Sequence, residues 1–206
     1  MPYVELHARS AFSFLRGGSL PEHLADAAAK AGLPALALCD RNGLYGAPRL
    51  FAERRERGVR PLVGAELAME DGSVVPVLVA SRDGYQNLSR LITRAQLRSP
   101  KGESRVRWDE VPEFAAGLIA LTGDEVGPVR RALERGASRE AEAALGRIVR
   151  AFGRGNVCVE VQRHLRRGEN EIVRSLRDLA GAHALPLVAT NGVLYAAPDY
   201  AEVLDV

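Results

Sequence analysis

Short runs of apolar residues alternate with segments of helical periodicity along the chain, and this alternation limits the fold more than any other feature. Residues 35–39 (Ala-Leu-Ala-Leu-Cys) are apolar at every position, so a strand formed by them must be buried on both faces. A parallel strand covered by helices meets that requirement. Residues 83–97 instead carry Leu88, Leu91 and Ile92 at helical spacing. The alternation predicts an α/β fold with a parallel sheet or barrel.

The same patterns locate the individual elements. Strands are predicted at residues 3–6, 35–39, 61–66, 74–80, 117–121, 156–161 and 187–190. A first helix is predicted between a capping box, Ser19-Leu20-Pro21-Glu22, and Gly32. Further helices are predicted at residues 45–57, 83–97, 128–135, 138–152 and 169–183, with a turn or helix after Pro198. The polar segment 98–108 is predicted to be a surface excursion.

The size and composition of the chain fit a single globular domain over residues 1–206. The chain is 47% hydrophobic and 26% charged, which excludes a disordered protein. No apolar run approaches the roughly 18 residues of a membrane helix, so a cytoplasmic location without membrane contact is predicted. The formal net charge of +2 is too small to indicate nucleic-acid binding by itself. Cys39 and Cys158 lie in apolar runs, which favours buried cysteines that form no disulfide.

Polar side chains come directly after most of the predicted strands. If the strands are parallel, these side chains converge on one face of the sheet, where α/β enzymes place their chemistry. The residues are His7, Arg9, Asp40, Arg41, Glu66, Asp124 and Asn191.

Four of these strand ends carry recognisable motifs. The stretch His7-Ala8-Arg9-Ser10, with Arg16 a few residues later, resembles the first motif of the PHP (polymerase and histidinol phosphatase) family, His-x-His-Ser followed by an Asp. Cys39-Asp40-Arg41-Asn42 is similar to the second motif, commonly Thr-Asp-His-Asn. Gly64-Ala65-Glu66 fits the Gly-x-Glu motif, and Asn191-Gly192-Val193-Leu194 stands where the family usually has Asn-Asp-x-His.

Connecting stretches narrow the resemblance. Residues 42–46 (Asn-Gly-Leu-Tyr-Gly), 83–88 and 186–191 are similar to the N-terminal PHP domain of bacterial C-family polymerases, and residues 12–17 (Phe-Ser-Phe-Leu-Arg-Gly) to its error-prone branch. The resemblance covers essentially the whole chain. It implies a distorted (β/α)7 barrel with mainly parallel strands, incomplete at the C-terminus, because family members continue beyond Leu204-Asp205-Val206.

The resemblance also implies a site, and this chain departs from it. An active PHP site holds up to three divalent ions with His, Asp and Glu ligands and hydrolyses phosphoesters. His7 and Glu66 are retained, and Asp124 takes the place of a later ligand. Arg9, Arg16 and Arg41 stand where the family has His, Asp and His, and Gly192 and Leu194 stand where it has Asp and His.

Arginine changes the chemistry of these positions. Its guanidinium group is always protonated and offers no lone pair, so it cannot bind a cation. Two like charges about 4 Å apart also repel by roughly 4 kcal/mol at an effective dielectric constant near 20. We therefore expect no catalytic metal cluster and no cofactor. The guanidinium groups are expected to pair with Asp40 and Glu66 in an ion network, or to hold a sulfate or phosphate ion.

Two main functional hypotheses follow. The first is a catalytically degenerate PHP domain, without phosphoesterase activity, that acts as a structural or binding module of an error-prone DNA polymerase III alpha-like subunit. Its partners would be the remainder of the polymerase or other replication and repair proteins, with DNA contacted only indirectly. The fragment could also self-associate to cover an exposed edge, or be a free-standing relative that regulates polymerases.

The second hypothesis is an enzyme. A metal-dependent phosphoesterase or 3′–5′ exonuclease would retain one or two ions of Mn, Zn or Mg through His7, Glu66 and Asp124. Other conspicuous residues are assigned to structural roles. His164 is predicted to be a hydrogen-bonded loop residue, His23 to be solvated, and Trp108 to pack its loop against the body of the protein.

Overall fold

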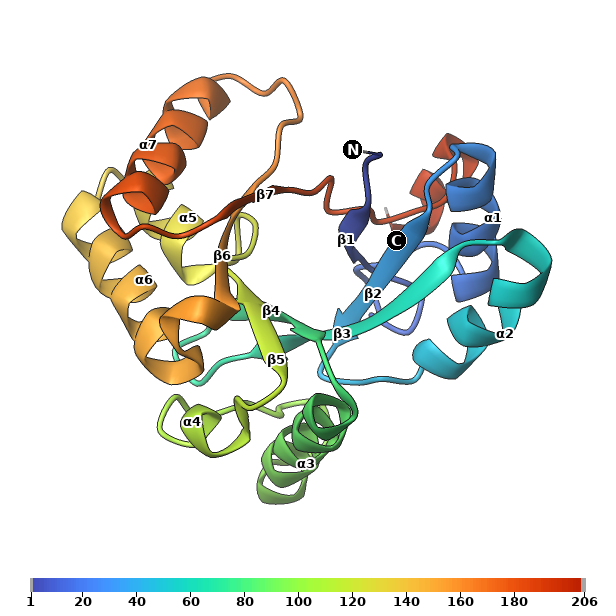
Figure 1. The fold of residues 1–206 in the computed structure, drawn as a ribbon, viewed down its shortest axis with the longest axis horizontal. Helices are drawn as coiled ribbons and strands as arrows, with labels where there is room; N and C mark the ends of the chain where they lie inside the picture. The colour runs from blue at the N-terminus through green and yellow to red at the C-terminus, as the bar shows by residue number, and fades with distance from the viewer. Residues whose placement is uncertain (1, 205–206) are drawn as a thin grey trace. The chain divides into compact units, whose positions relative to one another are not determined.

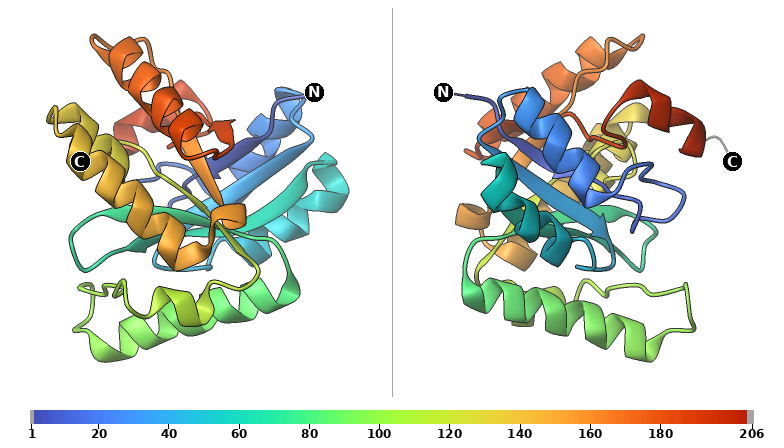
Figure 2. Two further views of the ribbon diagram at one scale, coloured as in Figure 1. Left: turned by 60° about the vertical axis from the view of Figure 1, so that its left-hand side comes forward. Right: turned by 90° about the vertical axis from the view of Figure 1, so that its right-hand side faces the viewer.

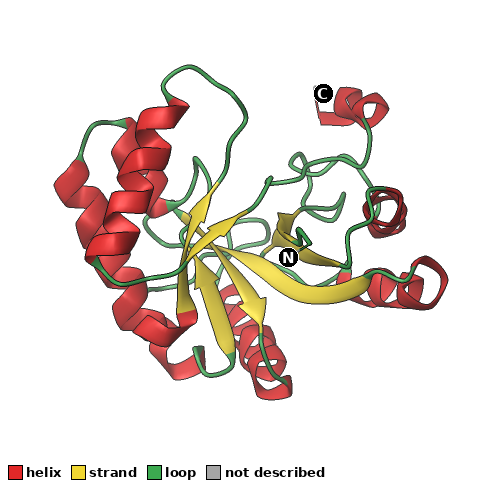
Figure 3. Cartoon of the chain, turned by 45° about the horizontal axis from the view of Figure 1, so that its top comes forward, coloured by secondary structure: helices red, strands yellow, loops and turns green. Residues whose placement is uncertain are grey.

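The computed structural model describes residues 2–204 and shows a mixed α/β fold (Figures 1 and 3). Its strands follow one another in the sheet in chain order: β1 (Glu5–Ala8), β2 (Ala35–Arg41), β3 (Arg60–Ala68), β4 (Val74–Val79), β5 (Leu118–Leu121), β6 (Val157–Val161) and β7 (Leu187–Ala189). Its helices are α1 (Pro21–Lys30), α2 (Ala47–Arg57), α3 (Arg82–Arg98), α4 (Val111–Phe114), α5 (Pro128–Glu134), α6 (Ser138–Phe152) and α7 (Glu169–Ala182), with 3₁₀ helices η1 (Arg154–Asn156) and η2 (Pro198–Leu204). The predicted α/β class with mainly parallel strands is confirmed.

The chain divides into two compact units. One contains the residues up to Glu66 together with those from Thr190 onward, and the other contains residues 67–189. The sequence resemblance implies that relatives continue beyond the last residues of this chain. Of these, Asp205 and Val206 lie outside the described residues. Within residues 2–204, no helix is both long and apolar enough to cross a membrane.

In the first unit, β1, β2 and β3 pair in parallel, and the register between β2 and β3 is unbroken to the C-terminal end of β2. Arg41 of β2 lies opposite Glu66 of β3. Helices α1 and α2 pack against each other beside these strands (Figure 1). Leu24 of α1, Leu38 of β2 and Leu50 of α2 belong to one buried cluster. Burial of both faces of β2 explains why its sequence is apolar until the strand ends.

In the second unit, β5, β6 and β7 are parallel, whereas β4 runs antiparallel to β5. The reversal has a local cause. Only a short turn around Gly72 precedes β4, and the amide of Met69 donates to the carbonyl of Ser73. A parallel connection would need a dozen or more residues. Long helices supply the rest of the core, with Leu91 of α3 and Leu145 of α6 fully buried. Helices α3 and α4 lie side by side (Figures 1 and 2).

Most predicted elements are found within a few residues of their predicted ends, and α6 has the predicted ends. The capping box is wrong. Helix α1 has no side-chain cap, and the Ser19 hydroxyl instead accepts a hydrogen bond from the amide of Ala196 at 2.9 Å. His23 is half-buried, not solvated, and its ring lies 5.1 Å from that of Tyr200. The predicted packing of Trp108 is confirmed, because its ring nitrogen donates to Asp71 at 2.9 Å.

Candidate functional site

Polar side chains occupy alternate positions of the N-terminal segment, so they share one face of β1. The first of them, Glu5, is buried and acts as an anchor. It accepts hydrogen bonds from the amide of His7 at 2.7 Å and from the amide of Asn191 at 2.9 Å. The hydroxyl of Tyr3 donates to it at 2.6 Å. Sequence reasoning missed Glu5. The signal was the alternation of polar residues at positions 3, 5, 7 and 9.

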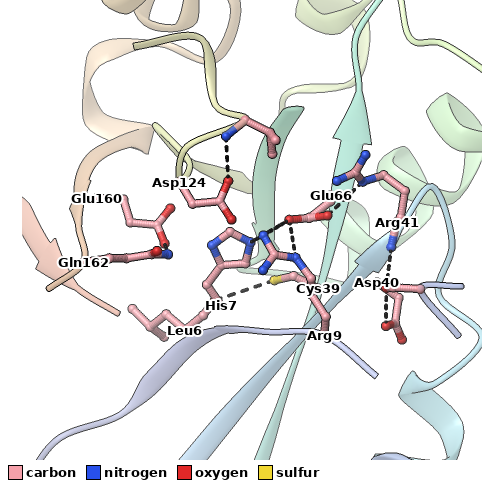
Figure 4. Close-up of polar contacts among 12 residues, drawn as sticks. Leu6, His7, Arg9, Cys39, Asp40, Arg41, Glu66, Asp124, Glu160 and Gln162 are labelled. Carbon is pink, nitrogen blue, oxygen red and sulfur yellow. Dashed lines mark hydrogen bonds and ion pairs between the residues drawn. The ribbon is translucent and has the colours of Figure 1, made fainter. Parts of the chain in front are cut away.

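Glu66, at the functional end of β3, is the centre of a buried ion network (Figure 4). Its Oε1 lies 2.9 Å from Nε2 of His7 and accepts a hydrogen bond from Nε of Arg9 at 2.8 Å. Its Oε2 accepts a hydrogen bond from Nε of Arg41, also at 2.8 Å. Both carboxylate oxygens therefore face cations, and three strands are joined through one side chain. We call His7, Arg9, Arg41 and Glu66 the Glu66 network.

The network keeps Glu66 ionised. Burial raises the pKa of a carboxyl group, but the charge of Arg9, the hydrogen bond from His7 and the charge of Arg41 hold the pKa of Glu66 well below its ordinary value. An ionised carboxylate only accepts hydrogen bonds, so the contact with Glu66 is a hydrogen bond in the tautomer of His7 whose Nε2 carries the hydrogen. The same nitrogen also lies 3.3 Å from a terminal guanidinium nitrogen of Arg9.

Asp40 has a different set of partners from the predicted one. Within residues 2–204 it accepts hydrogen bonds from the hydroxyls of Ser10 and Ser13, at 2.8 and 2.7 Å, and from the amide of Ser10 at 2.8 Å. The expected pairing of Asp40 with a guanidinium group is therefore wrong. Burial raises the pKa of Asp40, and the serine hydrogen bonds oppose that rise. Two hydroxyl donors satisfy the buried carboxylate oxygens without a counter-ion.

The loop after β1 is shaped to bring these serines inward. The amide of Gly17 donates to the carbonyl of Ser13 at 3.0 Å. A Cβ atom on Gly17 would lie 2.1 Å from the carbonyl oxygen of Ser10, so only glycine fits. Arg16, which was predicted to line the pocket, lies on this loop and is exposed.

The segment after β7 contributes main-chain groups to the first unit. Besides the Asn191 amide that binds Glu5, the carbonyl of Val193 accepts from the Arg9 amide at 2.9 Å, and the carbonyl of Leu194 accepts from the Gly18 amide at 2.8 Å. Gly192 adopts a left-handed conformation with φ of 59°. This segment therefore holds the ends of the site loop through its backbone, although its positions correspond to ligands in the family motif.

Asp124 belongs to the second unit, where it lies among other buried polar groups at the ends of β5 and β6. Its Oδ1 accepts a hydrogen bond from the amide of Val126 at 3.1 Å. Glu160 and Gln162 are both buried, and the side-chain Nε2 of Gln162 donates a hydrogen bond to Oε1 of Glu160 at 2.9 Å (Figure 4). The hydroxyl oxygen of Thr122 accepts from the Glu160 amide at 2.9 Å. Sequence reasoning missed Glu160, although it interrupts an otherwise apolar strand.

The histidine that follows this cluster is bound through its backbone. The amide of His164 donates to the carboxylate of Glu169 at 2.7 Å, and its ring Nε2 lies 3.4 Å from the side-chain oxygen of Gln162. The prediction of a hydrogen-bonded loop histidine is confirmed.

Comparison with known sequences gives a consistent result. The family model for the PHP domain matches residues 5–164. An error-prone DNA polymerase from Mycolicibacterium paratuberculosis is 40% identical over 211 residues, which cover 97% of this chain and 19% of the relative. The DNA polymerase III subunit alpha of Caulobacter vibrioides is 35% identical, with 98% of this chain and 19% of the relative covered. The chain thus spans about a fifth of the length of these curated relatives.

Solved structures resemble the chain in fold. A protein from Bifidobacterium adolescentis, assigned as a metal-dependent phosphoesterase, aligns with a TM-score of 0.62 and 15% identity over 96% of this chain and 91% of its own. The lesion-specific endonuclease PfuEndoQ from Pyrococcus furiosus aligns with a TM-score of 0.59 and 13% identity over 95% of this chain and 49% of its own. At these identities the likeness shows the fold alone.

Proposed function

We propose, because this chain belongs to the PHP domain family, that it is a degenerate member which serves as a structural and binding module of an error-prone DNA polymerase III alpha-like subunit. In this role it hydrolyses no phosphoester. The observation that carries the proposal is the Glu66 network, in which fixed cations contact both oxygens of the carboxylate.

The residues of this network do not fit a divalent metal cluster. A metal ligand must direct a lone pair at the ion, and neither Arg9 nor Arg41 has one to offer. Glu66 gives Oε1 to Arg9 and Oε2 to Arg41, and Nε2 of His7 lies 2.9 Å from the same carboxylate. A divalent ion placed here would meet two permanent positive charges in a buried setting, where repulsion is strong.

The same contacts support a structural role. Arg9 reaches Glu66 across 57 positions of sequence, and Arg41 reaches it across 25. The network therefore ties β1 and β2 to β3 at the end where a metal-dependent relative would need its ligands. Removing one member of a buried ion network is strongly destabilising, because it leaves an uncompensated charge. Cations of the protein itself would thus replace the cross-linking effect of bound ions.

The proposed partner is the rest of a polymerase chain. The curated relatives are about five times as long as this chain and are named as polymerases. Binding of other replication and repair proteins and self-association remain predictions from the sequence. The proposed anion site is less favoured than the ion network, since Nε of both arginines already donates to Glu66.

One observation favours an enzyme as the second candidate. His7 and Glu66 are retained from the family motif, and their side chains lie 2.9 Å apart. In a metal-dependent phosphoesterase or 3′–5′ exonuclease, these two residues and Asp124 would hold Mn, Zn or Mg, which would activate a water molecule for attack on phosphorus.

Metal analysis separates the two candidates. The protein is purified with Mn²⁺ and Zn²⁺, passed through a desalting column, and measured by plasma mass spectrometry beside the variant Glu66→Gln. We expect much less than one ion per chain in both, and no release of nucleotides from a labelled oligonucleotide. Stoichiometric metal in the unmodified chain that disappears in Glu66→Gln would overturn the structural proposal in favour of the enzyme.

A further inference from the structure

The loop that joins β6 to α7, residues 162–168, carries three arginines within five positions (Figure 1, orange). Arg163, Arg166 and Arg167 are all exposed. Within residues 2–204, none of the three has a carboxylate at ion-pair distance. Arg163 instead donates to the amide oxygen of Asn170 at 2.9 Å. We call residues 163–167 the basic loop.

The charges of the basic loop differ from those of two paired arginines in the same unit, and the difference lies in three charges, unpaired among the described residues, that cluster within five positions. On α3, Arg94 pairs with Glu113 at 2.6 Å, and before α6, Arg135 pairs with Glu140 at 2.8 Å. A cluster of exposed charges of one sign, left without counter-ions, raises the local potential and attracts an oppositely charged partner.

The backbone of the basic loop is bound by a buried glutamate that also pairs with a buried arginine. Glu169 is buried, and its Oε2 accepts hydrogen bonds from the amides of His164 at 2.7 Å and Arg166 at 3.3 Å. Arg130 of α5, also buried, lies 3.6 Å from the other oxygen of Glu169. The exposed arginines therefore project from a fixed backbone, which reduces the entropy that is lost when they bind a partner.

Leu165 marks the tip of the basic loop. Its side chain is 85% exposed, and its backbone is left-handed with φ of 59°, a conformation that L-residues with large side chains rarely adopt. Backbone strain of this kind is concentrated at binding and switch regions.

We propose that the basic loop binds the phosphate backbone of a DNA strand through the guanidinium groups of Arg163, Arg166 and Arg167. Guanidinium groups match the geometry of phosphate oxygens and bind them with charge-assisted hydrogen bonds. Closely spaced phosphates let three neighbouring arginines bind at once, and release of counter-ions drives the association. This contact is direct, where the sequence predicted only indirect contact with DNA.

The choice of DNA over an acidic protein rests on the proposed function as a polymerase module. The nearby acidic side chains do not cancel the charge of the loop, because Glu169 is paired with Arg130, and only Glu171 faces solvent in the first turn of α7. A site of this type is independent of sequence, since phosphate contacts position a nucleic acid without reading its bases.

The test is fluorescence anisotropy with a labelled oligothymidylate of about 20 nucleotides. This length exceeds the roughly 4–16 nucleotides that a typical single-strand-binding fold covers. Binding is measured for the 206-residue chain in EDTA at NaCl concentrations from about 50 to 200 mM. The loop variant is Arg163→Gln/Arg166→Gln/Arg167→Gln. The matched control, Arg82→Gln/Arg90→Gln/Arg139→Gln, removes the same charge from exposed arginines of the same unit for which the described residues offer no ion pair.

We expect the loop variant to bind roughly tenfold or more weakly at low salt, and the slope of log K against log [NaCl] to become shallower by about 2. The control should change affinity by less than about threefold, and both variants should melt at the temperature of the unmodified chain. Thermal melts establish that the loop variant is folded.

Several results would overturn the proposal: no saturable binding by the unmodified chain, equal losses in both variants, or an unchanged loop variant. Polyglutamate that competes as well as unlabelled oligonucleotide at equal charge would assign the loop to an acidic protein instead. Because EDTA removes divalent ions, these results do not depend on the metal analysis, and failure of either proposal can be recognised separately.

Discussion

The Glu66 network and the basic loop use the same residue type in opposite ways. Arg9 is buried, and Arg9 and Arg41 both bind the carboxylate of Glu66. Their charges are therefore compensated within the fold. Arg166 and Arg167 are exposed, and the described residues give them no acidic partner. The contrast teaches that the number of arginines does not indicate function here. What matters is whether the fold provides a counter-charge, because an enclosed ion pair stabilises structure while an uncompensated surface charge remains available to a partner.

The largest expected effect would come from removing the carboxylate of the network. Glu66→Ala leaves two guanidinium groups without their counter-charge, and we expect a loss of about 3–5 kcal/mol in the free energy of unfolding. Urea unfolding followed by circular dichroism measures it. The control Glu171→Ala removes an exposed carboxylate and should change stability by no more than about 0.5 kcal/mol. Equal effects of the two substitutions would contradict a structural role for the network.

The triple variant Arg9→Met/Glu66→Leu/Arg41→Met sharpens the same point. The variant replaces the two arginines and the glutamate and leaves only His7 of the network. Replacing a buried ion triad by apolar side chains is often neutral or stabilising. We therefore expect it to regain most of the stability that Glu66→Ala loses.

The serine partners of Asp40 come next. Ser13→Ala removes a 2.7 Å hydrogen bond to a buried carboxylate, and bonds to charged groups contribute about 1.5–3 kcal/mol. The free energy of unfolding should fall by that amount in a urea titration. Ser175→Ala, on α7 and without a side-chain hydrogen bond among the described residues, is the control and should be close to neutral. A neutral Ser13→Ala would show that water replaces the hydroxyl.

Acid should act on the two buried carboxylates in opposite directions. The pKa of Glu66 is lowered in the folded state, so its stabilising effect is present above its ordinary value of 4.5 and is lost as pH falls through the folded pKa. The pKa of Asp40 is raised from 3.8, so protonation of Asp40 favours the folded state as pH falls.

Urea midpoints measured from about pH 7 to pH 3 test this balance. Glu66→Gln should flatten the loss of stability in acid, and Asp40→Asn should make it steeper. Parallel curves for all three proteins would mean that other carboxyl groups control acid unfolding.

The smallest effect concerns the tip of the basic loop. Leu165→Gly relieves a left-handed backbone that costs a leucine about 1–2 kcal/mol, against a smaller entropic loss, and should raise stability by about 0.5–1 kcal/mol. Leu97, 84% exposed in the last turn of α3, is the matched control. Leu97→Gly should lower stability by up to about 1 kcal/mol in the same thermal melts. A loss in both would show that the Leu165 side chain packs against the protein.

Much of the fold could be predicted because its signals are local. The apolar run of β2 and the periodicity of α3 and α6 depend on residues within one strand or a few helical turns, and each element was found. The capping box at Ser19 failed for a tertiary reason. The chain returns after β7, and the Ala196 amide takes the hydroxyl oxygen that a local cap would have used.

The sequence predicted most residues of the candidate site, but it did not predict which of them contact one another. The residues identified from their motifs do lie together: His7, Arg9, Arg41 and Glu66. Arg16, from the first motif, is exposed. Glu5 was missed because its role is to bind backbone amides, one of them 186 positions away, and no sequence motif records that.

The sequence by itself determined that this is an alternating α/β protein of the PHP family, and that arginines stand at positions where a metal site needs lone pairs. Both are properties of residue type and short-range order. Only the tertiary structure decided which carboxylate the arginines share, that serines rather than arginines satisfy Asp40, and which arginines keep their charge exposed. These outcomes depend on strand register and on chain segments that meet across long separations, which side-chain chemistry alone does not specify.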